Sequence, residues 1–231
     1  MTVVRVCIAL AMFAVAAAVD IRRREVDDRL WLAFAGPAAA LYFVDYGNFD
    51  LVPALLSAGL GSGASYALYR TGLFGGADAL AMIALAVILP TYDGRFMLAG
   101  TVVHPLSTLT LLSNAVVLSS AHLAINVARN ARYWARHGDL FAGMDETRGR
   151  KALALLLGHR SSGQGFAFLM EKKAGARRFD FALKNTEETQ FESRKDVWVM
   201  PGMPFLAYML AGLVAMVLAG DLAFGLLTLF A

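Results

Sequence analysis

The chain has 231 residues, of which 58% are hydrophobic and only 17% are charged. An average soluble domain carries about 25% charged residues, so this composition indicates a membrane protein. The net charge is +3, yet lysine and arginine cluster in particular loops and form no continuous stripe, which argues against a nucleic-acid partner. The single cysteine, Cys7, excludes a disulfide within the chain and a paired-cysteine zinc site.

Apolar segments that are candidates for membrane spans recur along the chain. A helical span needs about 20 apolar residues. We find six such segments, at residues 3–19, 30–44, 51–69, 79–90, 97–127 and 205–230. The first is interpreted as a retained span, because its positive charges follow the apolar run instead of preceding it. The fifth is broken at His104-Pro105, so we expect its main helix from Leu106 onward. The third carries small residues that let helices approach closely: Gly59, Gly61, Ser62 and Gly63.

The distribution of lysine and arginine beside these segments predicts the orientation. One set of loops is basic and contains Arg22, Arg23, Arg24, Arg29 and Arg70. The opposite side offers only Arg5 and Arg95, beside Asp45, Asp50 and Asp93. We therefore expect the N-terminus outside the cell membrane, with Asp20 and Asp78 both at cytoplasmic ends of their segments.

The composition becomes more polar between Tyr133 and Trp198. Residues 137–150 indicate a linker, and residues 151–157 fit either a short helical turn or a strand. Strands are predicted at residues 165–170, 178–183, 188–192 and 197–199, separated by turns at residues 172–175 and 185–186. In the second of these, Phe179 and Phe181 alternate with Arg178 and Asp180, as in a half-buried strand.

The predicted fold is therefore an α-helical polytopic membrane protein with about six transmembrane helices and a small cytoplasmic antiparallel β-rich domain. Residues 1–132 would form transmembrane helices 1–5 and carry both aspartates. Residues 133–200 would form the cytoplasmic linker and β-rich domain, and residues 201–231 the sixth transmembrane helix.

The motifs of several membrane hydrolases are missing from the sequence. There is no His-Glu-x-x-His zinc-protease motif and no Gly-x-Ser-x-Gly nucleophile elbow. The four histidines are scattered and suggest no catalytic constellation: His104, His122, His137 and His159. Asp20 and Asp78 remain as candidates for a catalytic pair. Inserting an ionisable side chain into a membrane costs about 2.5–3.5 kcal/mol, so a functional role is the first interpretation of such a residue.

Two carboxylates that share a proton can hydrolyse a peptide bond without a metal or a protein nucleophile. The sequence leaves other roles open for both residues. Asp78 is also placed as a helix N-cap, and Asp20 can pair with Arg22, Arg23 or Arg24 at the membrane surface. Membrane aspartates serve in ion transport as well. A third aspartate, Asp221, is interpreted as a solvated helix end or a contact between helices.

Three stretches also resemble a known family. Gly75-Gly76-Ala77-Asp78 is similar to the Gly-x-Gly-Asp motif of membrane aspartyl proteases, in the variant of archaeal preflagellin peptidases and type IV prepilin peptidases. Asp20 followed by residues 22–31 resembles the segment around the first catalytic aspartate of that family. Residues 201–205, Pro-Gly-Met-Pro-Phe, resemble the proline-rich entry to its final helix.

The resemblance implies that Asp20 and Asp78 are the catalytic dyad, and that Gly75, Gly76 and Ala77 shape substrate access to Asp78. It implies no metal and no cofactor. Ala77 departs from the second motif glycine, which favours a helical or extended backbone there. The paired-cysteine insertion of bacterial prepilin peptidases is absent, so the resemblance implies no methyltransferase activity.

The implied substrates are preflagellins or pilin-like precursors, cleaved at the cytoplasmic face after a short basic leader. The β-rich domain would hold the substrate by strand addition, or its basic surface would face membrane lipids. A presenilin-like intramembrane protease and a small proton-coupled transporter using the same aspartates are the alternatives. A pure scaffold gives no reason for two aspartates on one side.

Overall fold

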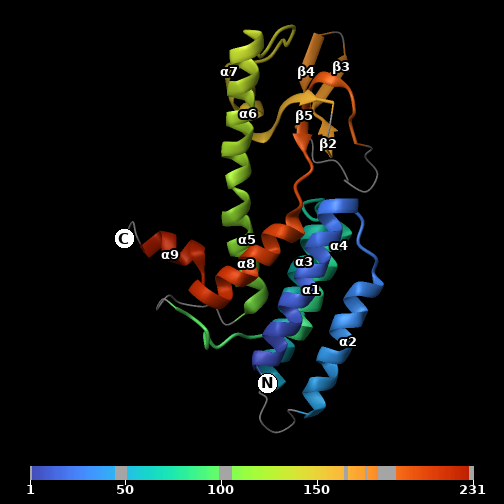
Figure 1. The fold of residues 1–231 in the computed structure, drawn as a ribbon, viewed down its shortest axis with the longest axis vertical. Coiled ribbons are helices and arrows are strands. Elements are labelled where there is room, and N and C mark those ends of the chain that lie inside the picture. The colour runs from blue at the N-terminus through green and yellow to red at the C-terminus, as the bar shows by residue number, and fades with distance from the viewer. Residues whose placement is uncertain are drawn as a thin grey trace. The chain divides into compact units, whose positions relative to one another are not determined.

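The computed structural model describes residues 2–44, 51–98, 106–163, 166–174, 176–181 and 191–228. Contacts between residues divide the chain into two compact units (Figure 1). Unit 1 comprises Met1–Ser119 and Pro204–Ala231, and unit 2 comprises Ser120–Met203. The predicted domain boundaries near residues 133 and 200 stay predictions.

Unit 1 is helical over its described residues. Its helices are α1 (Thr2–Arg23), α2 (Arg29–Val44), α3 (Leu51–Arg70), α4 (Gly76–Ile88), α5 (Ser107–Ser119), α8 (Phe205–Ala219) and α9 (Leu222–Thr228). The core lies among α1, α4, α5 and α8, where small residues such as Ala9, Ala16 and Ala81 let the helix backbones approach. The larger side chains that fill this core include Met12, Phe13, Met82, Leu85, Leu111, Leu206, Met209 and Leu213.

Within the described residues, three helical stretches are long and apolar enough to cross a membrane: α1, α3, and the 31 residues Ser107–His137 that contain α5 and α6 (Ala121–His137). The consecutive helices α8 and α9 would make a fourth span if they are counted together. Helices α2 and α4 are shorter apolar helices. Large apolar side chains on the outside of unit 1, such as Leu55, Leu56 and Leu60, suit contact with lipid. The structure therefore supports a helical membrane protein, while six spans stay a prediction.

The predicted last segment, 205–230, is not one straight helix. A bend of 58° separates α8 from α9. The bend lies at Gly220, whose φ of +83° is a left-handed value that favours glycine. Asp221 follows it and accepts hydrogen bonds from the Phe224 N–H at 3.0 Å and from the Ser113 hydroxyl at 3.3 Å. Of the two interpretations of Asp221, the contact between helices is therefore confirmed.

The small residues of α3 differ in what they contact. A Cβ added at Gly61 would lie 2.7 Å from the Thr108 hydroxyl oxygen, so glycine permits the close approach of α3 and α5. Nothing lies within 4 Å of a Cβ added at Gly59 or Gly63. The predicted role of this small-residue run is therefore confirmed at Gly61 alone among these three glycines.

Arg5 is not a loop charge, in contrast to the prediction. It lies within α1, is only 3% exposed, and faces Tyr42 with its guanidinium carbon 4.1 Å from the ring centroid. The predicted orientation does not change, because Arg5 had been counted on the side opposite the basic loops.

In the part of unit 2 that the structure describes, two helices accompany two small antiparallel sheets. Its elements are α6, α7 (Arg148–Leu157), β1 (His159–Ser162), β2 (Ala167–Leu169), β3 (Glu171–Ala174), β4 (Ala176–Phe179) and β5 (Lys195–Pro201). One sheet has the order β1-β5-β2, with His159 opposite Val199 and Phe168 opposite Met200. The other is the β3–β4 hairpin, with Lys172 opposite Arg178. The predicted antiparallel sheet is thereby confirmed.

Local details of unit 2 differ from the sequence predictions. The turn predicted at residues 172–175 is wrong for its first three residues, because Glu171–Ala174 is strand β3, and its fourth residue lies outside the described residues. The strand predicted at 178–183 is shifted, because β4 ends at Phe179. Asp180, predicted on an exposed face, is 9% exposed, and its carboxylate lies 3.3 Å from the Lys172 ammonium. Residues 151–157, open between helix and strand, belong to α7.

The core of unit 2 forms around Trp198 on the central strand β5. Phe141 stacks on the indole ring at 5.3 Å, and Phe179 packs edge-on at 5.2 Å. The buried Glu171 carboxylate accepts hydrogen bonds from the backbone N–H of Trp198 at 2.6 Å and from two nitrogens of Arg177, at 2.8 and 3.0 Å. This pairing satisfies a buried charge, which otherwise would cost several kcal/mol.

Some predictions fall outside the described residues. These are the break at His104-Pro105, the turn at residues 185–186, the loop aspartates Asp45 and Asp50, and most of the strand at residues 188–192. The main helix predicted from Leu106 onward is confirmed, since α5 begins at Ser107.

Candidate active site

The approach to Asp78 begins with the end of helix α3. The Gly72 N–H donates to the Tyr69 carbonyl at 3.0 Å, and the Leu73 N–H donates to the Leu68 carbonyl at 3.1 Å. Gly72 has a φ of +74°, so the four residues form a Schellman cap with glycine in the left-handed position. This cap ends α3 and reverses the chain towards Phe74 and the glycine pair.

Helix α4 begins within the glycine pair, at Gly76. Gly75 is its N-cap, with the extended backbone values φ −73° and ψ 162°. Gly76, Ala77 and Asp78 form its first turn, so Ala77 has the helical one of the two backbone conformations, helical or extended, that the sequence left open. Neither glycine of the pair is among the residues with positive φ. The bend therefore comes from Gly72, and an extended Gly75 leads directly into the helix.

Asp78 is the third helical residue of α4 and not the N-cap that the sequence suggested. Its Oδ2 accepts a hydrogen bond from the Gly75 N–H at 3.2 Å. A carboxylate in the first helical turn is also stabilised by the helix dipole. A Cβ added at Gly75 would lie 3.4 Å from the same oxygen, so this glycine leaves open space beside the carboxylate.

Asp20 lies in the last turn of α1 and is partly exposed, as is Asp78. Helices α1 and α4 pack against each other, and the two carboxylates interact electrostatically. Two residues 58 positions apart in the sequence thus share one neighbourhood at the ends of two helices. The two carboxylates are therefore near enough for their charges to interact, and their catalytic role stays a prediction.

A cation that the sequence did not single out belongs to the same neighbourhood. Arg22, Arg23 and Arg24 were equivalent partners for Asp20 in the sequence. In the structure Arg24 interacts electrostatically with both Asp20 and Asp78. Arg22 and Arg23 are exposed, whereas Arg24 is partly buried. No sequence pattern separates the three, since the difference arises from the backbone at the end of α1.

The entry to α8 contacts the turn before Asp78. The ring of Phe205, the first residue of α8, lies 5.5 Å from the ring of Phe74. Phe74 also packs against the core of unit 1. The proline-rich entry and the glycine motif, separated by more than 120 residues, are therefore neighbours.

The donor side chains of a metal site do not converge in the described ranges. No group of three or more His, Cys, Asp or Glu side chains there has the arrangement needed to hold an ion. Cys7 is exposed on α1.

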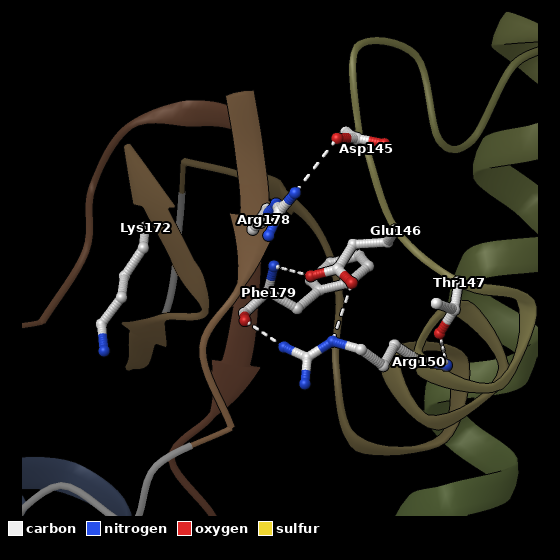
Figure 2. Close-up of a pocket in the computed structure, with 7 residues that line it drawn as sticks. All are labelled: Asp145, Glu146, Thr147, Arg150, Lys172, Arg178 and Phe179. Carbon is white, nitrogen blue, oxygen red and sulfur yellow. Dashed lines mark hydrogen bonds and ion pairs between the residues drawn. The ribbon is translucent and has the colours of Figure 1, made fainter. Parts of the chain in front are cut away.

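Unit 2 carries a separate pocket of about 650 Å³ with charged walls, which the sequence did not predict (Figure 2). Its lining residues are Asp145, Glu146, Thr147, Arg150, Lys172, Arg178 and Phe179. Glu146 accepts hydrogen bonds from the Phe179 N–H at 2.6 Å and from Arg150 at 2.7 Å, and Arg178 pairs with Asp145 at 3.3 Å. Figure 2 draws these interactions as dashed lines. The cations are already paired with carboxylates, so the pocket has no unbalanced charge to define a ligand.

The buried carboxylate of this pocket has a lowered pKa. Burial alone would raise the pKa of Glu146, but the hydrogen bond from the Phe179 N–H and the pairing with Arg150 together outweigh burial and lower the pKa below its usual value. Glu146 therefore stays ionised and joins α7 to strand β4. Its role in unit 2 is structural.

Two family models match the chain. The model of the type IV leader peptidase family matches residues 7–124, which include both Asp20 and Asp78. The model described as Archaeal Peptidase A24 C-terminus Type II matches residues 135–222, which include the sheets of unit 2 and helix α8. No curated protein matches the chain.

Proposed function

The chain belongs to the type IV leader peptidase family and is an aspartic-type leader peptidase, and we propose that its substrates are preflagellins or type IV pilin-like precursors. The match of residues 135–222 to an archaeal C-terminal region of the same family favours preflagellins. The observation that supports the proposal most is the electrostatic interaction between Asp20 and Asp78, both of which lie within the matched region 7–124.

In the proposed mechanism the two aspartates share one proton. The ionised carboxylate accepts a proton from a water molecule as the water oxygen attacks the scissile carbonyl carbon. The protonated carboxyl donates its proton to the carbonyl oxygen, which gives a neutral tetrahedral intermediate. Collapse of this intermediate breaks the C–N bond and transfers a proton to the leaving amine. The reaction uses water as the nucleophile and forms no covalent enzyme intermediate.

The surroundings of Asp78 support this assignment. The Gly75 N–H holds one oxygen of the Asp78 carboxylate, and the missing side chain at Gly75 leaves space beside it. An extended substrate backbone can approach closest where no side chain intervenes. We infer that Gly75, Gly76 and Ala77 form the substrate-binding edge next to the catalytic residue.

The proposed arrangement in the membrane follows from the charges of the loops. Six spans with the N-terminus outside would put Asp20 and Asp78 at the cytoplasmic face. A precursor could then keep its apolar helix in the bilayer while its basic leader stays in the cytoplasm. The basic residues at the ends of these helices, Arg22, Arg23, Arg29 and Arg70, support this orientation.

The test is cleavage of a preflagellin or pilin-like precursor by the purified full-length protein, with the new N-terminus identified by mass spectrometry. Asp20→Asn and Asp78→Asn should each lower the rate by about 10²–10⁴-fold, because each removes an acid–base group. Asp221→Asn is the matched control, since Asp221 caps α9 and should leave the rate unchanged. Full cleavage by either active-site variant would refute the dyad.

A further inference from the structure

Arg24 has a backbone conformation that is unusual for its residue type. Its φ is +60°, and among the described non-glycine residues only Arg24 and Asp196 have positive φ. The Arg24 N–H donates to the Asp20 carbonyl at 3.0 Å, so Arg24 closes α1 as its left-handed cap. Helices most often place glycine at this position. A strained residue at such a point is a reason to ask what its side chain does.

The side chain of Arg24 points to an electrostatic role. Its Nε atom is buried, and the residue interacts with both Asp20 and Asp78. Arg22 and Arg23, its neighbours on α1, are exposed and are not among the groups acting on either carboxylate. The left-handed cap thus separates one arginine from its neighbours and gives it a place beside the aspartate pair.

We propose that Arg24 is a positioning residue of the active site, whose positive charge balances the single negative charge of the aspartate pair. This inference rests on the proposed function, in which one carboxylate is ionised while the other keeps its proton. A nearby cation favours the ionised form of a carboxylate. Arg24 would therefore maintain the ionised aspartate that accepts the proton from water.

The pH profile of cleavage depends on the charged groups that face the aspartate pair. The groups that act on Asp78 are Asp20 and Arg24, and the group that acts on Asp20 is Arg24. The remaining ionisable side chains near the same ends of the helices packed around α1 and α4 are Arg22, Arg23, Glu25, Asp27, Asp28, Arg29, Tyr69, Arg70 and Tyr208.

The strained backbone provides a clean variant. Arg24→Gly removes the charge and suits the observed φ, so its thermal stability should equal or exceed that of the wild type. Its kcat should fall about tenfold near neutral pH with little change in KM, and the acidic limb of its pH–activity profile should move to higher pH by about one unit. Arg24→Lys keeps the charge and should keep the profile. Arg23→Gln, which removes an exposed neighbouring charge, is the matched control.

The outcomes separate this inference from the proposed function. If the wild type cleaves the precursor and Arg24→Gly keeps its kcat and pH profile, the role of Arg24 is refuted and the peptidase remains. If the wild type does not cleave the precursor, the proposed function fails and this inference fails with it. If Arg24→Gly does not fold, Arg24→Asn is judged by the same criteria, because asparagine is neutral and tolerates left-handed φ.

Discussion

The Arg5 guanidinium donates a hydrogen bond to the Ile88 carbonyl, 3.1 Å away, and so joins the start of α1 to the last turn of α4. The Tyr42 hydroxyl donates to the neighbouring Val87 carbonyl at 2.6 Å. A positive charge at the C-terminal end of a helix is favourable, since the unpaired carbonyls there carry partial negative charge. Asp78 lies at the other end of the same helix. A buried cation at one end of α4 therefore stabilises the helix that positions the candidate active site at its other end.

Replacing Arg5 should destabilise the protein without changing the chemistry of cleavage. Arg5→Met leaves the Ile88 carbonyl without this donor, and we expect a loss of about 1.5–3 kcal/mol in the free energy of unfolding. The measurement is the thermal midpoint of the purified protein in detergent. Tyr42→Phe removes a neutral hydrogen bond and should cost about 1 kcal/mol. A pH–activity profile that shifts in Arg5→Met would contradict a purely structural role.

Asn114 joins α5 to the bend between α8 and α9, and its replacement should be costly. Its side-chain amide donates to the Gly220 carbonyl at 2.9 Å and accepts from the Leu222 N–H at 2.7 Å. Asn114 is fully buried, so Asn114→Leu would leave both backbone groups unpaired and cost about 2–4 kcal/mol. Asp221→Asn should stay within about 0.5 kcal/mol, because asparagine caps helices as well as aspartate. Equal losses in the two variants would contradict this account.

Gly212 permits the close packing of α5 and α8. A Cβ added there would lie 2.9 Å from the Ala115 nitrogen, a backbone atom that cannot move aside without shifting the helix. We expect Gly212→Ala to cost about 1–3 kcal/mol through overpacking. Gly63→Ala is the control, since nothing lies within 4 Å of its added Cβ and alanine favours a helix. The thermal midpoints of the two variants should therefore shift from that of the wild type in opposite directions or by clearly different amounts.

The sequence predicted the helices and the two aspartates for a physical reason. Apolar runs end where polar side chains reach the membrane edge, so Asp20 and Asp78 mark the ends of their segments. It also offered Asp78 as an N-cap, whereas the structure places it three residues later than the cap. Glycine has no capping side chain, so Gly75 gave no signal for the start of α4.

The parts that the sequence missed depend on contacts between distant residues. Strand β3 contains Lys172 and Lys173, and the absence of apolar alternation made this stretch resemble a turn. Arg5 counted as a loop charge because its partner Ile88 is 83 positions away. Arg24 was indistinguishable from its neighbours, since its backbone φ cannot be seen in a run of three arginines. Burial, pairing and local strain appear only in the folded chain.

The last prediction concerns the pH dependence of unit 2. Burial of His159 in strand β1, together with the nearby Arg129 charge, lowers the pKa of its imidazole from 6.5 to about 4. The unfolded chain binds a proton near pH 6.5, whereas the folded chain resists protonation down to about pH 4. The stabilising effect of the neutral imidazole is therefore complete above pH 6.5 and decreases as the pH falls towards 4.

This sign can be checked by hydrogen exchange at the β1 amides of the full-length protein between pH 7 and pH 5. After correction for the intrinsic pH dependence of exchange, protection should decrease over this range in the wild type and much less in His159→Gln, which cannot be protonated. Glu192 acts in a different window. Pairing with Arg194 lowers the pKa of its carboxyl from 4.5 to about 2, so its contribution is lost only below about pH 4.5. Glu192→Gln should therefore leave the change in amide protection between pH 7 and pH 5 the same as in the wild type. An equal slope in the wild type and His159→Gln would show that another group titrates on unfolding of unit 2.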